Sequence, residues 1–326
     1  MNQQLKVVVT DHEYKTLHHE HEQLERIGVE VVDCQCKTEE ELIANTADAD
    51  GLLVQYAYIS RRVIENLNKC RAIVRYGIGI DCVDVGAATE HGIMVANVPD
   101  YGLQDVADHT VALLLAAARK IVPLNQAVKS GVWDFNLARP AYRLEGKVLG
   151  LVAFGSIARM VAERVKPFGI KVQVYDPYIT PEVVAKWGAT SVKLDTLMAT
   201  SDFISLHAPL LMGTRCLINA KMLDLVKPTA ILVNTARGGL IDEPALIAAL
   251  QNGKLGGAAL DVTAIEPIKA DSALLKLDNV IITPHAAWYT EEAQDSLQYK
   301  AACDMARAMT GQVLVNILNP ECLADR

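Results

Sequence analysis

Two successive series of short β-branched runs, with helical segments between them, constrain the fold more than any other feature of this sequence. The second series is the more regular, and about 140 residues of it contain six buried-type runs: KVLGLVAF, KVQVYD, DFISLHAP, AILVNTA, GAALDV and NVIITPH. Strands that read as continuous apolar runs are typical of a parallel sheet covered by helices on both faces. We therefore predict a doubly wound α/β domain in the second half of the chain.

The first series repeats this architecture on a smaller scale. It contains the runs KVVV, VEVV, GLLV, AIV and IMVANV, with helical patterns near residues 14–27, 38–46, 60–67 and 84–90. These alternate as in a second doubly wound parallel sheet. A helical period returns at residues 289–312, and we expect this helix to complete the small first domain. The predicted domains are residues 1–101 plus 289–326, and residues 102–288.

A long apolar helix is predicted between the two series, at roughly residues 104–122. Apolar residues occupy most of its faces, whereas a surface helix has one apolar stripe. We therefore expect this helix to be buried between the domains or against another subunit.

Composition excludes several classes of function. A net charge of −8 and the lack of a long Lys/Arg cluster argue against a nucleic acid as ligand. The longest apolar stretch, Val111–Ala118, is well short of the ~20 residues that a membrane span needs. The seven cysteines are scattered, and the amino terminus enters a strand without a signal-peptide pattern. We expect a cytoplasmic protein that does not enter a membrane.

Four histidines lie close together near the amino terminus, at His12, His18, His19 and His21. At helical spacing His18 and His21 share one face, while His19 is turned away. The segment reads as a solvated polar helix surface, and we predict no metal site in it.

The stretch AFGSIA at residues 153–158 is an altered dinucleotide fingerprint. Gly155 keeps the second glycine, which lets the backbone approach a pyrophosphate, and Ala158 is an accepted replacement for the third. Ala153 replaces the first, and we expect the turn to tolerate it only with a negative φ. Asp176 lies eighteen residues beyond Ala158, near the spacing of an acid that accepts ribose hydroxyls. No Arg follows it to neutralise a 2′-phosphate, which favours NAD over NADP.

The strands of the second domain end in chemically active residue types. In a doubly wound sheet ligands bind at the carboxyl ends of the strands, so these residues are expected to meet at one edge. The strand ends are Gly155, Asp176, His207-Ala208-Pro209, Thr235-Ala236-Arg237, Asp261 and Pro284-His285.

An Arg, a carboxylate and a His at one sheet edge suit proton-coupled hydride transfer on a 2-oxo acid. Arg237 would bind the substrate carboxylate with its planar guanidinium. His285 would donate a proton to the forming alkoxide, and Glu266 would hold its ring in the correct tautomer. Read singly, Arg237 could instead be an ordinary loop cation and Glu266 a turn acid.

At these residues a family resemblance becomes visible. The segments RYGIGIDCVDVGAA, LVNTARGGLIDEPAL, GAALDV with Glu266-Pro267, and TPHAAW resemble the D-isomer-specific 2-hydroxyacid dehydrogenases over nearly the whole chain. The stretch PHAAWYTEEA is also similar to the C-terminal-binding-protein branch, and the chain is similar to phosphoglycerate dehydrogenases.

The resemblance implies a flavodoxin-like substrate domain, a Rossmann NAD-binding domain and an active site in the cleft between them. It implies a homodimer formed through the long helix. The implied catalytic residues are Arg237, Glu266 and His285. The implied substrate-binding residues are Arg75, Tyr76, Gly77, Ile78 and Trp288, with Tyr101 a further candidate. The implied NAD contacts are Gly155, Ser156, Ile157, Asp176, His207, Ala208, Pro209, Thr235, Ala236, Arg237, Asp261 and His285.

These observations predict an NAD-dependent oxidoreductase acting on a small 2-oxo or 2-hydroxy acid. Two alternatives stay open: a phosphoglycerate dehydrogenase, and an NADH-responsive scaffold with a dehydrogenase fold. The aromatic residues Trp288, Tyr76 and Tyr101 favour a medium-sized, partly apolar substrate side chain. A phosphate would need cationic groups beyond Arg75.

Overall fold

The structure is a computed structural model that describes residues 4–324. The chain divides into two compact units. Unit 1 combines the chain up to Gly102 with the segment from Thr290 onward, and unit 2 spans Leu103–Tyr289. Each unit is built on its own parallel sheet, which confirms the predicted α/β class.

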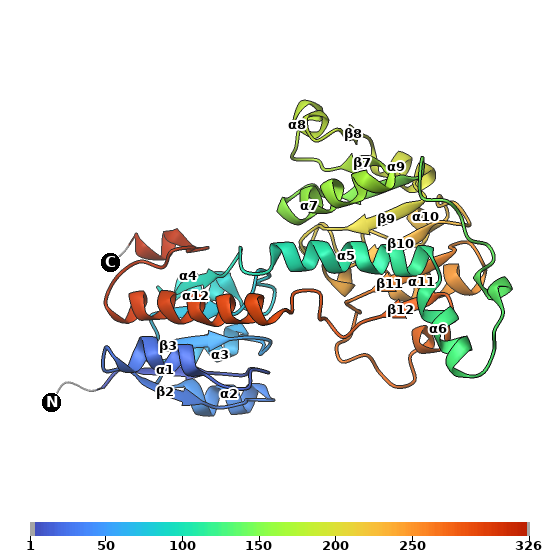
Figure 1. Cartoon of the computed structure of the whole chain (residues 1–326). Helices are drawn as coiled ribbons and strands as arrows, with labels where there is room; N and C mark the ends of the chain where they lie inside the picture. Colours follow the sequence, from blue (N-terminus) through green and yellow to red (C-terminus); the bar gives the residue numbers. More distant parts are fainter. Residues whose placement is uncertain (1–3, 325–326) are drawn as a thin grey trace. The chain divides into compact units, whose positions relative to one another are not determined.

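Unit 1, whose strands are coloured blue to cyan in Figure 1, contains a five-stranded parallel sheet in the order β2-β1-β3-β4-β5, which is the flavodoxin-like order. Its strands are β1 (Lys6–Val9), β2 (Glu30–Asp33), β3 (Gly51–Val54), β4 (Ala72–Arg75) and β5 (Met94–Asn97). Its helices are α1 (His18–Glu25), α2 (Glu39–Thr46), α3 (Arg61–Glu65), α4 (Val85–Glu90), α12 (Glu291–Met309) and the short η5 (Pro320–Leu323).

Helix α12 closes unit 1, although it is separated from the other elements by the whole of unit 2. It packs on α1 and on strands β3 and β4. Gly51 permits this approach, because a Cβ there would lie 2.5 Å from the sulfur of Met305 on α12. A small residue at the start of β3 therefore sets how closely the last long helix packs on the sheet.

Unit 2 contains a seven-stranded parallel sheet in the order β12-β11-β10-β9-β6-β7-β8. The chain order reverses between β6 and β9, as in a Rossmann sheet. Its strands are β6 (Val148–Val152), β7 (Lys171–Tyr175), β8 (Thr190–Ser191), β9 (Phe203–Leu206), β10 (Ile231–Asn234), β11 (Gly257–Leu260) and β12 (Val280–Ile282). Six were predicted, and β8 is too short to give a hydrophobic run.

Helices cover both faces of this sheet. They are α5 (Leu103–Ala118), α6 (Ile121–Lys129), α7 (Ser156–Val165), α8 (Pro181–Lys186), α9 (Leu194–Thr200), α10 (Ala220–Leu223) and α11 (Glu243–Gln251), with short helices η1 (Phe135–Ala138), η2 (Lys166–Phe168), η3 (Gly238–Leu240) and η4 (Ala273–Lys276). All strand pairs are parallel, so the carboxyl ends of the strands meet at one edge.

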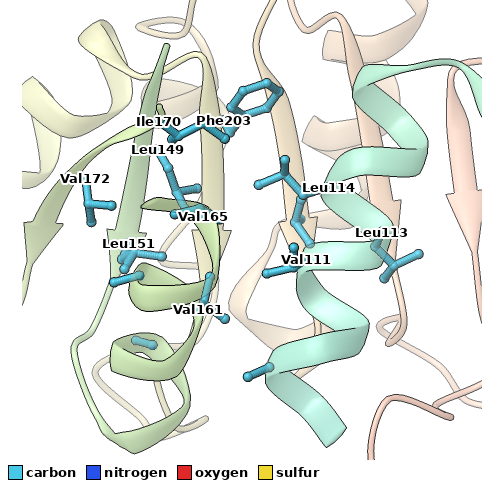
Figure 2. Packing of buried hydrophobic residues seen from close by; sticks show 14 of the residues in the cluster. Val111, Leu113, Leu114, Leu149, Leu151, Val161, Val165, Ile170, Val172 and Phe203 are labelled. Atoms are coloured by element: carbon cyan, nitrogen blue, oxygen red, sulfur yellow. The ribbon is translucent and has the colours of Figure 1, made fainter. Parts of the chain in front are cut away.

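The predicted long helix is two helices, which corrects its length. It breaks at Lys120, which has a φ of 55°. Pro123 explains the break, because proline is tolerated in the first turn of a new helix but not inside a continuous one. Helix α5 packs on α7, β10 and β11 of its own unit, and Val111 and Leu114 face the sheet core (Figure 2). Its apolar face is therefore used within unit 2.

The segment that follows α5 exposes apolar side chains instead. Trp133 is 90% exposed and Phe135 is 74% exposed. Ile121, Val128 and Leu137 on the same segment are also exposed. Large apolar residues gathered on one surface segment are typical of an interaction site.

No single helix within residues 4–324 has the length and apolar composition to span a membrane. Helices α5 and α6 meet that test only when taken together, and they are bent by 62° at their break.

Candidate active site

The strongest chemical feature of unit 2 is a histidine–carboxylate pair. His285 Nδ1 lies 2.7 Å from Glu266 Oε2. The main-chain N–H of Thr263 donates to the other oxygen, Glu266 Oε1, at 3.0 Å. Burial alone would raise the pKa of Glu266, but the His285 hydrogen bond, the Thr263 N–H and the charge of Arg237 outweigh it and lower that pKa. Glu266 is therefore an ionised carboxylate that orients the ring of His285.

The backbone places His285 in an uncommon conformation, with a φ of 53°. Its N–H donates to the main-chain oxygens of Asp261 at 2.8 Å and Thr283 at 3.0 Å. The next two amides, those of Ala286 and Ala287, each donate to the Asp261 carboxylate at 2.9 Å. Asp261, at the end of β11, thus fixes the turn that carries His285.

His109 on α5 supports this turn and was not among the predicted residues. Its Nε2 lies 3.1 Å from Thr283 Oγ1 and 3.6 Å from Asp261 Oδ1. Thr283 Oγ1 in turn donates to Asp261 Oδ1 at 2.5 Å. The signal in the sequence was a polar pair, Asp108-His109, within an otherwise apolar helical run.

Arg237 follows β10 on a turn held by Asn234. The Asn234 side chain accepts from the Ala236 N–H at 3.0 Å and donates to the Arg237 carbonyl at 2.9 Å. Gly238 lets this turn pack on the Glu266 loop, because a Cβ at Gly238 would lie 1.9 Å from the carbonyl oxygen of Thr263. The structure thereby brings the Arg237 turn and the Glu266 loop into contact, as the sequence predicted.

The altered glycine loop fits a dinucleotide in most respects. Gly155 precedes α7, and a Cβ there would meet nothing within 4 Å, so there is open space beside Gly155, next to the helix amino terminus that suits a phosphate. The Asp176 carboxylate accepts from the Phe154 and Tyr178 N–H groups at 2.9 and 2.8 Å. Each oxygen keeps a lone pair for a ribose hydroxyl. Ser156 and Ile157 form the first turn of α7.

The expectation for Ala153 is wrong. Its φ is +71°, in the left-handed region, rather than negative. The turn geometry that favours glycine has been kept and alanine accommodates it, at a cost of about 1 kcal/mol.

The remaining predicted cofactor residues lie at the ends of β9 and β10. His207 bonds Ser205 through Nε2 at 3.0 Å, and burial lowers its pKa to about 4, so its ring is neutral at pH 7. Thr235 is nearly buried and shares a 2.7 Å hydroxyl hydrogen bond with Thr110. Ala208 is buried, whereas Pro209 is exposed and Ala236 is partly exposed. These residues stand at the predicted edge of the sheet.

The predicted substrate residues of unit 1 follow β4. Arg75 is 8% exposed, and its Nε has no hydrogen-bond partner among the described residues. The guanidinium folds back over Gly77, where a Cβ would lie 1.6 Å from Arg75 Nη1. Gly77 has a φ of +136°, so both space and backbone favour glycine there. The Ile78 carbonyl accepts from Asn97 Nδ2 at 2.5 Å.

The expectation that the ring of Tyr76 lines a pocket is wrong. The residue is 1% exposed, and its hydroxyl donates to buried Glu20 on α1 at 2.7 Å. Helix α1 covers this position, so the ring belongs to the core of unit 1. Trp288, in unit 2, stays partly exposed and packs edge-on against Tyr289 at 5.6 Å between ring centroids.

Comparison with known proteins identifies the family. The profile described as D-isomer specific 2-hydroxyacid dehydrogenase, NAD binding domain, matches residues 111–287. The chain belongs to this family. Unit 2 therefore contains the family's NAD-binding domain, and its strand order and glycine loop agree with that assignment.

Several known proteins are similar over nearly the whole chain. The D-3-phosphoglycerate dehydrogenase of Methanocaldococcus jannaschii is 43% identical over 318 residues, which are 97% of this chain and 59% of that protein. The chain thus spans little more than half of this relative. The TT0316 protein from Thermus thermophilus is 32% identical, with a TM-score of 0.87 and coverage of 96% and 100% of the two chains. The D-lactate dehydrogenase from Aquifex aeolicus, solved with NAD and lactic acid, is 27% identical, with a TM-score of 0.86 and coverage of 96% and 99%.

Proposed function

We propose that this protein is an NAD-dependent oxidoreductase that interconverts a 2-oxo acid and the corresponding (D-)2-hydroxy acid. The observation that carries the proposal is the 2.7 Å His285–Glu266 pair on a loop in contact with the Arg237 turn. A titratable imidazole, an oriented carboxylate and a guanidinium at one sheet edge are the groups that acid–base chemistry on a 2-oxo acid needs. Family membership supports the same reaction.

Each residue has a distinct role in the proposed reaction. Arg237 binds the substrate carboxylate in a bidentate manner and polarises the adjacent carbonyl. His285 donates its Nε2 proton to the forming alkoxide and recovers it in the reverse direction, while Nδ1 stays on Glu266. NADH, when bound, supplies the hydride. Asp176 and the open amino terminus of α7 would hold the cofactor, and the carboxylate disfavours the additional phosphate of NADPH.

The proposed substrate has a medium-sized, partly apolar side chain. Trp288 and Tyr101 are partly exposed and are proposed as the aromatic contacts, whereas Tyr76 would contribute only its backbone. Arg75 and Gly77 are proposed to face the substrate carboxylate. The name of the Methanocaldococcus relative favours D-3-phosphoglycerate as a second candidate.

A pair of matched substrates separates these candidates. NADH oxidation is measured with hydroxypyruvate and phosphohydroxypyruvate, which differ only by the phosphate, and with pyruvate, glyoxylate, a branched-chain and a thioether 2-oxo acid. A preference of roughly 10²-fold or more for the phosphorylated member would select the second candidate, because a site built for a charged group strongly rejects its absence. A higher kcat/KM with the branched-chain or thioether acid than with phosphohydroxypyruvate supports the first candidate, a substrate with a partly apolar side chain.

The same assay tests whether the protein is an enzyme at all. NADPH serves as the parallel control for cofactor choice. If NADH binds, as seen by fluorescence titration, but no acid of the panel is reduced, the dehydrogenase proposal fails and an NADH-responsive scaffold takes its place.

We also propose a homodimer formed through residues 121–137. The support is the exposed apolar surface of that segment, with Trp133 and Phe135 at its centre. Light scattering is expected to show a dimer for the wild type and a monomer for the double variant Trp133→Ser/Phe135→Ser. Tyr178→Ser is the matched control, because Tyr178 is 92% exposed but lies outside the segment. A dimeric double variant would refute this interface.

The proposed location is the cytoplasm. Its support is the cysteine chemistry, since no disulfide joins any of the seven cysteines, all of which lie within residues 4–324.

A further inference from the structure

Unit 1 brings together two imidazoles and a carboxylate that are separate from the residues discussed above. His18 and His19 begin α1, and Asp295 lies near the start of α12. One potential ligand atom from each of the three side chains lies within 4.8 Å of the other two. The arrangement joins segments that are 276 residues apart in sequence.

The geometry of His19 corrects the expectation that it is turned away from its neighbours. The side chain is 12% exposed and lies against α12, where Nε2 is 2.8 Å from Asp295 Oδ1. The other ring nitrogen, Nδ1, is buried and has no hydrogen-bond partner within residues 4–324. His19 thus has a carboxylate partner on one nitrogen and an unused nitrogen on the other.

His18 completes the cluster. Its ring centroid lies 3.8 Å from that of His19, and its Nδ1 is 3.3 Å from Thr16 Oγ1. The hydroxyl contact leaves Nε2 of His18 for another ligand. The remaining two histidines of the segment have separate partners, because His12 pairs with Asp33 at 3.0 Å and His21 with Glu25 at 2.7 Å.

We propose that His18, His19 and Asp295 bind a divalent late first-row metal ion such as Zn²⁺. Neutral imidazole and carboxylate are ligands that Zn²⁺ prefers, and three protein ligands leave one position for water. Zn–N and Zn–O bonds of about 2.0–2.2 Å place two ligand atoms roughly 3–4 Å apart. Ligand atoms as much as 4.8 Å apart must therefore come closer, whereas His19 Nε2 and Asp295 Oδ1, at 2.8 Å, must separate slightly. The Asp295 side chain is 65% exposed and His18 is exposed, so both can make this movement.

The local charge favours a cation. The first turn of α12 carries Glu291 and Glu292 beside Asp295, and the first turn of α1 carries Glu20. A bound ion would link the first helix of unit 1 to its last long helix. Because the site exists only in the folded protein, binding would stabilise unit 1.

The test is a titration of the chelator-treated full-length protein with Zn²⁺, followed by calorimetry and by thermal unfolding. The expected result is one Zn²⁺ per chain and a Tm that rises with Zn²⁺ concentration. His18→Ala and Asp295→Asn are each expected to weaken binding by about tenfold or more. Both positions are exposed, so the metal-free variants should unfold at nearly the wild-type temperature.

His21→Ala is the matched control. It removes an imidazole from the same helix but outside the cluster, and it should keep wild-type affinity. Equal Zn²⁺ affinity in all three variants would show an adventitious ion only, and absence of stoichiometric binding by the wild type would overturn the proposal directly. NADH binding should be unchanged by Zn²⁺, which separates this site from the proposed reaction centre.

Discussion

Two turns at the carboxyl edge of the unit 2 sheet both hold a non-glycine residue at positive φ, but they are supported very differently. Ala153 has a φ of 71° and His285 a φ of 53°. The His285 turn is fixed by three main-chain N–H groups on Asp261 and by Glu266 on the ring. The Ala153 turn has a main-chain bond to Tyr175 and the Phe154–Asp176 contact.

The two positions differ in whether the strained backbone positions a side chain with a proposed role in the reaction. A left-handed residue with a Cβ costs about 1 kcal/mol at either site. At position 285 this cost is offset by hydrogen bonds, and the imidazole has a proposed role that no glycine could fill. At position 153 the side chain is a methyl group that cannot take part in acid–base chemistry, so the backbone strain there supports no proposed catalytic role.

The largest effect is expected from His285→Gln. Removing the proton donor should lower kcat by about 10²- to 10⁴-fold, because general acid catalysis contributes a factor of that size. Gln suffers the same backbone strain, so stability should change little. Steady-state kinetics and NADH fluorescence titration test this, with unchanged NADH affinity as the internal control. Retained turnover would remove His285 from the acid–base role.

Asp261→Asn tests whether the hydrogen-bond network holds the His285 turn. The Asn side-chain carbonyl can replace only one of the two carboxylate oxygens. Its NH₂ group would face the N–H of Ala286 or Ala287, which is also a donor, so that hydrogen bond would be lost. We expect a loss of about 2 kcal/mol in the free energy of unfolding, together with reduced turnover.

The control for Asp261→Asn is Asp224→Asn, which breaks an exposed ion pair with Lys254. Such surface pairs contribute about 0–1 kcal/mol. Similar urea midpoints for the two variants would show that the His285 turn does not depend on Asp261.

Ala153→Gly tests the opposite turn. Glycine relieves about 1 kcal/mol of left-handed strain but gains freedom in the unfolded chain, which offsets roughly half of it, and we expect a net stabilisation of about 0.5 kcal/mol in urea unfolding. NADH affinity should be equal or higher. Ala158→Gly is the matched control, because Ala158 is buried inside α7 and glycine there should destabilise. A destabilised Ala153→Gly would show that the methyl contributes packing.

The comparison also shows what the sequence could supply. Hydrophobic runs predicted six of seven strands in unit 2, and the strand-end residues indicated which segments lie at its edge. The fingerprint located the turn at Ala153, but residue type alone did not give its φ. Pro123 is a local signal for the break at Lys120, but the apolar pattern of residues 104–122 led to the prediction of one continuous helix.

Other features depended on tertiary packing. Tyr76 follows a strand, and only the docking of α1 above it decides that its ring pairs with Glu20 rather than a ligand. His109 gained its partners from β11 and β12, which are more than 140 residues away in sequence. The pairing of His19 with Asp295 likewise required α12 to pack on α1. Periodicity describes one element at a time, so it did not predict these contacts.

The smallest effect is expected from Glu266→Gln, measured as a function of pH. The folded-state pKa of Glu266 is lowered, so its stabilising contribution is present above the ordinary glutamate pKa of ~4.3 and is lost as pH falls through the lowered value. The wild type should therefore lose more stability than Glu266→Gln on acidification below that range. The difference should be small because the Glu266 side chain is 38% exposed. Glu163→Gln, an exposed position on α7, should follow the wild type. Parallel acid profiles for wild type and Glu266→Gln would mean that ionised Glu266 does not stabilise the His285 turn, and would leave Asp261 as its main support.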